Sequence, residues 1–63
     1  MKATLNFNNM ELAKSFIRAW ALRTLKGHDR SAVKKDGSVD VTVYDVTESE
    51  KKFIFEYAVK LNA

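Results

Sequence analysis

Apolar and polar side chains alternate at the start of the chain, over residues 2–7. The apolar positions are Ala3, Leu5 and Phe7. Alternation with a period of two is typical of a strand that buries one face. Asn8 and Asn9 follow, and either side chain is well suited to cap the N-terminus of a helix. We therefore predict a strand over residues 2–7 that leads directly into a helix.

The spacing of apolar residues becomes helical over residues 10–26. At about 100° per residue, one broad stripe contains Leu12, Ala13, Phe16, Ile17, Trp20 and Thr24. The opposite face contains Lys14, Arg18, Leu22 and Leu25, so two leucines stand where the pattern favours polar residues. Gly27 follows, in the position where a helix C-terminus favours a residue with positive φ. The pattern predicts an amphipathic helix over residues 10–26.

The segment Lys35-Asp36-Gly37 indicates a hairpin loop, and its length decides which side chains face the core. A two-residue Asp-Gly loop would place basic residues on the same face as the valines of the following strand. A three-residue loop with Gly37 in the left-handed position pairs Val33 with Val39 instead, so that Val33 faces the core together with the valines of the following strand. Because a slip of one residue exchanges the two faces of a strand, we predict the three-residue loop. Arg30, Lys34 and Tyr44 then point away from the core.

The last segment, over residues 48–61, fits two patterns. Its alternating aromatic and aliphatic residues are typical of a strand. Thr47 and Glu50, however, have the spacing of a capping box. A helical stripe of Ile54, Tyr57, Ala58 and Leu61 follows, and Glu-to-Lys pairs four residues apart support a helix. We predict a helix and keep the strand as the alternative.

Together these elements predict a single α+β domain over residues 1–63, with the order β-α-β-β-α. We expect a three-stranded antiparallel sheet with both helices on one face. This order is similar to that of DinI-type regulators of recombinase filaments. The acidic partner-binding helix of that family is not matched, because Lys51, Lys52 and Lys60 lie among the acidic residues of the last segment. The resemblance therefore implies the fold alone.

Composition argues against catalysis and against cofactors. The chain has no cysteine and one histidine, which excludes disulfides, thiolate zinc sites and multi-histidine metal sites. His28, Asp29 and Arg30 are the only cluster with catalytic residue types, but adjacent residues rarely converge on one substrate atom. The acidic residues around Glu48 lack the spacing of a calcium loop. We expect neither an enzyme nor a bound cofactor or metal.

The apolar runs are too short for a membrane span, which needs roughly 18 residues. The alternation over residues 2–7 is also unlike the continuous apolar core of a signal peptide. We expect a cytoplasmic protein with no membrane partner.

The formal net charge is +3, but residues 14–35 contain seven basic residues and one acidic residue. The basic residues are Lys14, Arg18, Arg23, Lys26, Arg30, Lys34 and Lys35. Such a surface would follow a phosphate backbone, and Tyr44, on the open face of the predicted sheet near Arg30, would stack on a base. The alternatives are a solvated helix face and a tyrosine that covers neighbouring strands. No array of base-reading side chains is present, so our first hypothesis is non-specific nucleic-acid binding.

Three apolar residues, Leu22, Leu25 and Val59, lie off the predicted core stripes, and Phe55 lies at the edge of one. Apolar side chains surrounded by charged ones indicate a protein contact. The alternative function is therefore a protein-binding regulator or inhibitor of a larger enzyme, of the kind found among phage or mobile-element accessory proteins. The same residues would also serve a homodimer.

Overall fold

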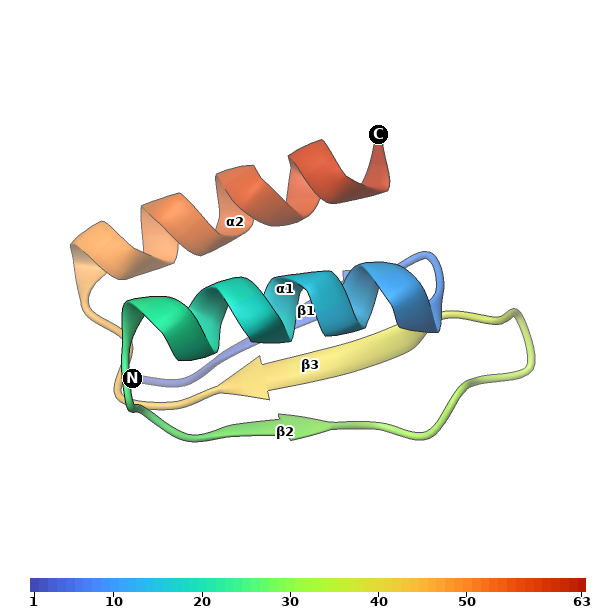
Figure 1. Ribbon diagram of the computed structural model, residues 1–63, viewed down its shortest axis with the longest axis horizontal. Helices are drawn as coiled ribbons and strands as arrows, with labels where there is room; N and C mark the ends of the chain where they lie inside the picture. The colour runs from blue at the N-terminus through green and yellow to red at the C-terminus, as the bar shows by residue number, and fades with distance from the viewer.

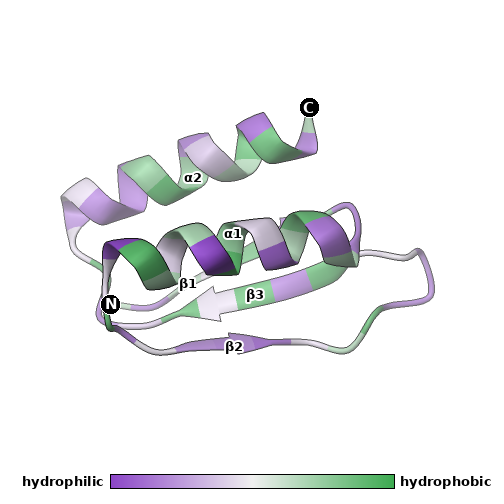
Figure 2. Ribbon diagram, in the orientation of Figure 1, coloured by the Kyte–Doolittle hydropathy of each residue, from purple (hydrophilic) through white to green (hydrophobic).

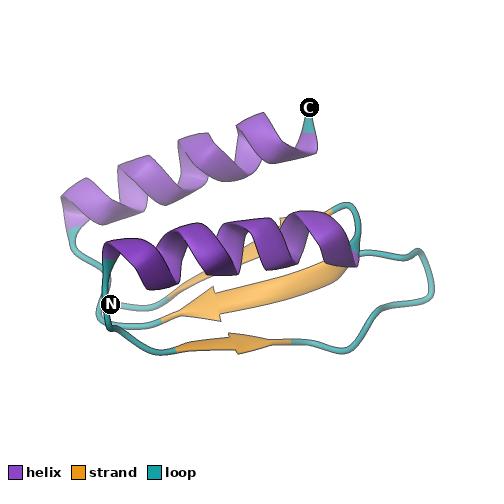
Figure 3. Cartoon of the chain, viewed as in Figure 1, coloured by secondary structure: helices purple, strands orange, loops and turns teal.

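The computed structural model describes all residues from 1 to 63 and shows two layers, a sheet and a pair of helices (Figure 1). Strands β1 (Ala3–Phe7), β2 (His28–Arg30) and β3 (Val39–Val43) form an antiparallel sheet in the order β1-β3-β2. Helices α1 (Met10–Arg23) and α2 (Glu48–Asn62) cover one face of that sheet (Figure 3). The predicted α+β class and the order β-α-β-β-α are confirmed.

The core lies between the sheet and the helices. Its twelve buried apolar residues are Ala3, Leu5, Phe7, Ala13, Phe16, Trp20, Val39, Val41, Val43, Val46, Ile54 and Ala58. Figure 2 shows the corresponding alternation of apolar and polar positions along β3. Every second residue of β1 and β3 faces the helices, and the predicted stripes of both helices face the sheet. For β1, β3 and both helices, the hydrophobic pattern of the sequence therefore defines the core correctly.

The start of α1 agrees with the sequence, but its end does not. The side chain of Asn9 accepts a hydrogen bond from the backbone N–H of Leu12, so Asn9 is the cap. The helix ends at Arg23, three residues earlier than predicted, because Thr24 adopts an extended conformation that directs the chain towards β2. Gly27 does not have a positive φ, so its predicted role as the helix-ending residue is wrong.

Helix α2 begins with the predicted capping box. The Thr47 hydroxyl accepts from the Glu50 N–H at 3.2 Å, and a Glu50 carboxylate oxygen accepts from the Thr47 N–H at 3.0 Å. Two N–H groups that a helix start leaves unpaired are thereby satisfied. The helical prediction for this segment is confirmed, and the strand alternative is wrong.

The loop between β2 and β3 also forms as predicted. Gly37 has a φ of 88° and its N–H donates to the carbonyl of Lys34 at 2.9 Å. The N–H of Lys34 donates to the carbonyl of Ser38, which closes a three-residue loop. The left-handed conformation explains why glycine occupies position 37.

On the β2 side of this loop, the pairing of β2 with β3 is shifted by one residue from the predicted pairing. Arg30 lies opposite Val41, whereas the predicted pairing placed it opposite Thr42. The hydroxyl oxygen of Ser31 accepts from the N–H of Asp40 and replaces a bond of the regular ladder. As a consequence Val33 is exposed, and the prediction that it faces the core is wrong. Arg30 lies on the helix side of the sheet, so its predicted place on the open face is also wrong.

Candidate functional site

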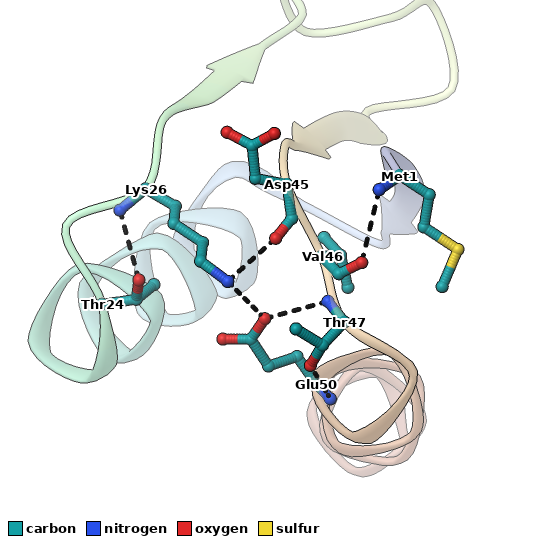
Figure 4. A network of polar contacts seen from close by, with 7 residues as sticks. All are labelled: Met1, Thr24, Lys26, Asp45, Val46, Thr47 and Glu50. Carbon is teal, nitrogen blue, oxygen red and sulfur yellow. Dashed lines mark hydrogen bonds and ion pairs between the residues drawn. The ribbon is translucent and has the colours of Figure 1, made fainter.

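Lys26 is held within the molecule by two contacts. Its Nζ lies 2.6 Å from a carboxylate oxygen of Glu50 and 2.8 Å from the carbonyl oxygen of Asp45 (Figure 4). The hydrogen bond from Lys26, followed by the backbone bond from Thr47, lowers the pKa of Glu50 to about 2. Lys26 therefore joins the segment after α1 to the start of α2, and its charge is largely neutralised there.

Lys34 is likewise paired, on the face of the sheet that the helices leave open. Its ammonium lies 2.5 Å from one carboxylate oxygen of Asp40, and the other oxygen accepts from the side chain of Asn6 at 2.9 Å. These two bonds, with that of Lys34 the larger, lower the pKa of Asp40. The hydroxyls of Thr4 and Thr42 lie 3.0 Å apart on the same face. The open face is thus a set of mutually bonded polar side chains.

Tyr44 contacts a carboxylate and not the predicted cation. Its hydroxyl donates to Asp29, and this bond raises the pKa of Tyr44. Arg30 lies on the other side of the sheet, where its guanidinium is 3.3 Å from the sulfur of Met10. The predicted association of Tyr44 with Arg30 on one face is therefore wrong. A neighbouring carboxylate opposes the approach of a phosphate, in contrast to the cationic surroundings of stacking sites for single strands.

Arg23 is the fourth basic residue with a partner in the molecule. Its guanidinium carbon lies 4.1 Å from the centre of the Phe53 ring, a distance typical of a cation–π contact. Phe53 in turn stacks on Tyr57 at 5.8 Å between ring centres. Arg23 therefore covers aromatic side chains of α2.

The remaining basic residues of the segment, Lys14, Arg18 and Lys35, are exposed and form no ion pair. Lys14 and Arg18 are one turn apart on the outer side of α1, and Leu22 continues the same line. Leu22 is 85% exposed, and Leu25, just beyond the helix, is fully exposed. We call Lys14, Arg18, Leu22 and Leu25 the α1 surface. It combines two free cations with two free leucines.

Phe55 and Val59 lie on a different part of the molecule. They are one turn apart on α2 and are 41% and 71% exposed. Together with Ala58 they line a shallow groove whose other wall is formed by Thr4, Leu5 and Asn6 of β1. We call this hollow the β1–α2 groove. The sequence identified its α2 side chains, but the contribution of β1 follows from the strand order alone.

Comparisons of the chain with family models, with curated proteins and with solved structures give no match. Neither helix has the length and apolar character needed to cross a membrane. No three His, Asp or Glu side chains gather in a way that would hold a metal ion. What the protein binds must therefore be inferred from its own surfaces.

Proposed function

We propose that the protein is a non-enzymatic binding module that regulates or inhibits a larger protein. Its α1 surface would dock on a segment of the partner that carries acidic and apolar side chains. The observation that carries this proposal is the exposure of Leu22, one helical turn from the unpaired cation Arg18, with Leu25 exposed just beyond the end of the helix. Leucines anchor a contact by leaving water, and neighbouring cations select an acidic partner.

Nucleic-acid binding is the second candidate, and the free cations favour it. Lys14 and Arg18 project from one side of α1, and Lys35 lies at the tip of the hairpin loop. Four of the seven basic residues in the segment contact groups of the same molecule, so few are free to meet phosphates. Exposed leucines also contribute nothing to phosphate binding. For these reasons we rank protein binding first.

Affinity capture from a lysate of the source cells, with and without nuclease, tests the two candidates. We expect a protein to be retained in a fixed ratio after nuclease treatment and to be lost with Leu22→Ser. Val33→Ser is the matched control, because Val33 is an exposed apolar residue outside both the α1 surface and the β1–α2 groove, so its loss should not affect retention. Equal retention by Leu22→Ser and the wild type would contradict docking through the α1 surface.

A salt titration with labelled duplex DNA tests the second candidate directly. If Lys14, Arg18 and Lys35 meet phosphates, log K against log salt should have a slope of about −3, from roughly −0.9 for each contact. The double variant Lys14→Glu/Arg18→Glu should bind all sequences more weakly and reduce the slope. Binding that is absent, or that does not depend on salt, would remove nucleic acid as a candidate.

A further inference from the structure

The two outer edges of the sheet differ in how well they are protected. The edge formed by β2 is short and consists of the exposed polar and charged residues His28–Arg30. It is followed directly by the irregular segment at Ser31, where the ladder is interrupted. Short, charged and irregular edges do not pair readily with other chains. The edge at β2 is thus unsuited to receive another strand.

The edge formed by β1 lacks these features. β1 contains five residues, Ala3–Phe7, with no charge, no proline and a regular register against β3. The carbonyl of Asn6 points outward, since it accepts a hydrogen bond from the side chain of Asn62 at 2.9 Å. Because backbone groups alternate between the two sides of an antiparallel strand, those of Thr4 point outward too. Asn62 thus occupies the far end of this edge and leaves the groups at Thr4 free.

The β1–α2 groove lies along this same edge. Its walls include Thr4 and Asn6, whose side chains point to the open face, so the groove opens at the outer side of β1 and not towards α1. Phe55 and Val59 line the groove from α2 and are 41% and 71% exposed. An unpaired strand edge therefore runs beside two unpaired apolar side chains.

We propose that this edge binds a second copy of the chain, with the two β1 strands antiparallel. A two-fold axis close to Thr4 would pair Thr4 with Thr4 of the second copy and would place Lys2 opposite its Asn6, whose carbonyl keeps the bond from Asn62. The three-stranded sheets would then join into one continuous sheet. The same rotation brings the two α2 helices together, so Phe55 and Val59 of both copies leave water in a single self-complementary contact.

The charges of α2 and of Lys2 favour a second copy of the chain over a strongly acidic or strongly basic partner. Helix α2 contains three acidic residues and three lysines, so the meeting of two such helices brings no net repulsion. Lys2, beside the free edge, would lie near Asn6 of the other copy and near the Asp40 carboxylate to which that Asn6 is bonded. The contact is therefore complementary to itself. It does not involve the α1 surface and is independent of the proposed partner binding.

Analytical ultracentrifugation of the full chain tests this proposal. With rising concentration, we expect the wild type to pass from its monomer mass of 7.2 kDa to twice that value. Val59→Lys should weaken the dimer by about tenfold or more, because a charge then replaces an apolar side chain in the contact. Leu22→Lys makes the same change at an exposed position on α1 and should leave the dimer intact. Circular dichroism checks that both variants are folded.

Hydrogen exchange at the backbone of Thr4 provides a second measurement. In the wild type the Thr4 N–H should exchange more slowly as concentration rises, whereas in Val59→Lys it should remain fast. A wild type that stays monomeric at high micromolar concentration would overturn the proposal. So would a dimer in which Thr4 still exchanges fast, or one that Leu22→Lys disrupts and Val59→Lys does not.

Discussion

Individual side chains hold together parts of this small protein that are distant in the sequence. Lys26 bonds to Glu50, and Glu50 also closes the capping box at the start of α2 (Figure 4). A single carboxylate therefore serves both the helix start and the connection between α1 and α2. Protonation of Glu50 should therefore lower the free energy of unfolding of the whole domain.

The pKa of Glu50 predicts a specific dependence of stability on pH. Its pKa is about 2 in the folded protein against an ordinary value of 4.5, so its contribution is complete above 4.5 and is lost as pH falls towards 2. Glu50→Gln should therefore lower the free energy of unfolding at neutral pH, with the difference from wild type shrinking over that range. Denaturant titrations at several pH values measure this. Lys26→Met should reduce the same pH dependence, and an unchanged profile in both variants would contradict the assignment.

Substitution by alanine should have different effects on stability at the two glycines. Gly37 has a φ of 88°, so Gly37→Ala should destabilise the domain by about 1–2 kcal/mol, although its Cβ would meet open space. Gly27 has no positive φ, and an added Cβ would lie 3.9 Å from the Tyr44 ring, an ordinary contact. Gly27→Ala should be neutral or stabilise by up to about 1 kcal/mol through the unfolded chain. Urea denaturation of both variants gives the comparison, and equal losses would contradict it.

At the scale of elements, α2 is anchored at both ends. The capping box fixes its start, and at its other end the Asn62 side chain bonds to the N–H of Asn8 and to the carbonyl of Asn6. The carbonyl of Asn62 accepts from the Asn8 side chain as well. These contacts hold the helix over β1 and so determine where the β1–α2 groove opens.

Loss of the cap should weaken α2 by a definite amount. Thr47→Ala removes the acceptor for the Glu50 N–H and should cost about 0.5–2 kcal/mol of stability. Thr47→Ser keeps the hydroxyl and should retain most of the stability that the cap contributes. Thermal denaturation of the two variants measures the difference. A serine variant as unstable as the alanine variant would show that the hydroxyl is not the source of the effect.

Loss of the Asn62 contacts at the C-terminal end of α2 should affect only the structure near that end. Asn62→Ala removes the two side-chain bonds, to the carbonyl of Asn6 and from the N–H of Asn8, so the last turn of α2 should fray. We expect faster amide exchange at Asn8 and over the final residues of the helix, while the capping box at Thr47 remains protected. Uniform acceleration across α2 would instead mean that the helix opens as one unit.

At the scale of the whole molecule, the two candidate surfaces lie on different elements. The α1 surface faces away from the sheet, whereas the β1–α2 groove follows the outer edge of β1. A dimer through β1 would leave both α1 surfaces free and would present two copies of them to a partner. A domain of 63 residues buries a small core, so the added contact should also stabilise the fold.

This coupling predicts a melting temperature that depends on concentration. The midpoint of the wild type should rise with protein concentration, because dimerisation removes folded monomer from the unfolding equilibrium. The midpoint of Val59→Lys should begin to rise only at concentrations about tenfold higher or more, and that of Leu22→Lys should follow the wild type. Differential scanning calorimetry over a range of concentrations measures all three. A constant midpoint in the wild type would argue against a dimer.

The sequence by itself determined the order of the elements and the buried faces of β1, β3, α1 and α2. The stripe through Ala13, Phe16 and Trp20 and the valines of β3 point to the core as predicted. The capping box and the left-handed Gly37 also form as expected. These features depend on residues a few positions apart in the chain, so the spacing of residue types is enough to predict them.

The tertiary structure decided the features that depend on contacts between residues far apart in the sequence. α1 ends early, with Lys26 bound to Glu50, 24 positions away. The register of β2 shifts because Ser31 bonds to Asp40 across the hairpin, and this moves Arg30 away from Tyr44. The strand order places β1 at an edge, which no local pattern indicates. The candidate surfaces therefore became visible only in the fold, because long-range contacts decide which cations are paired and which edge is free.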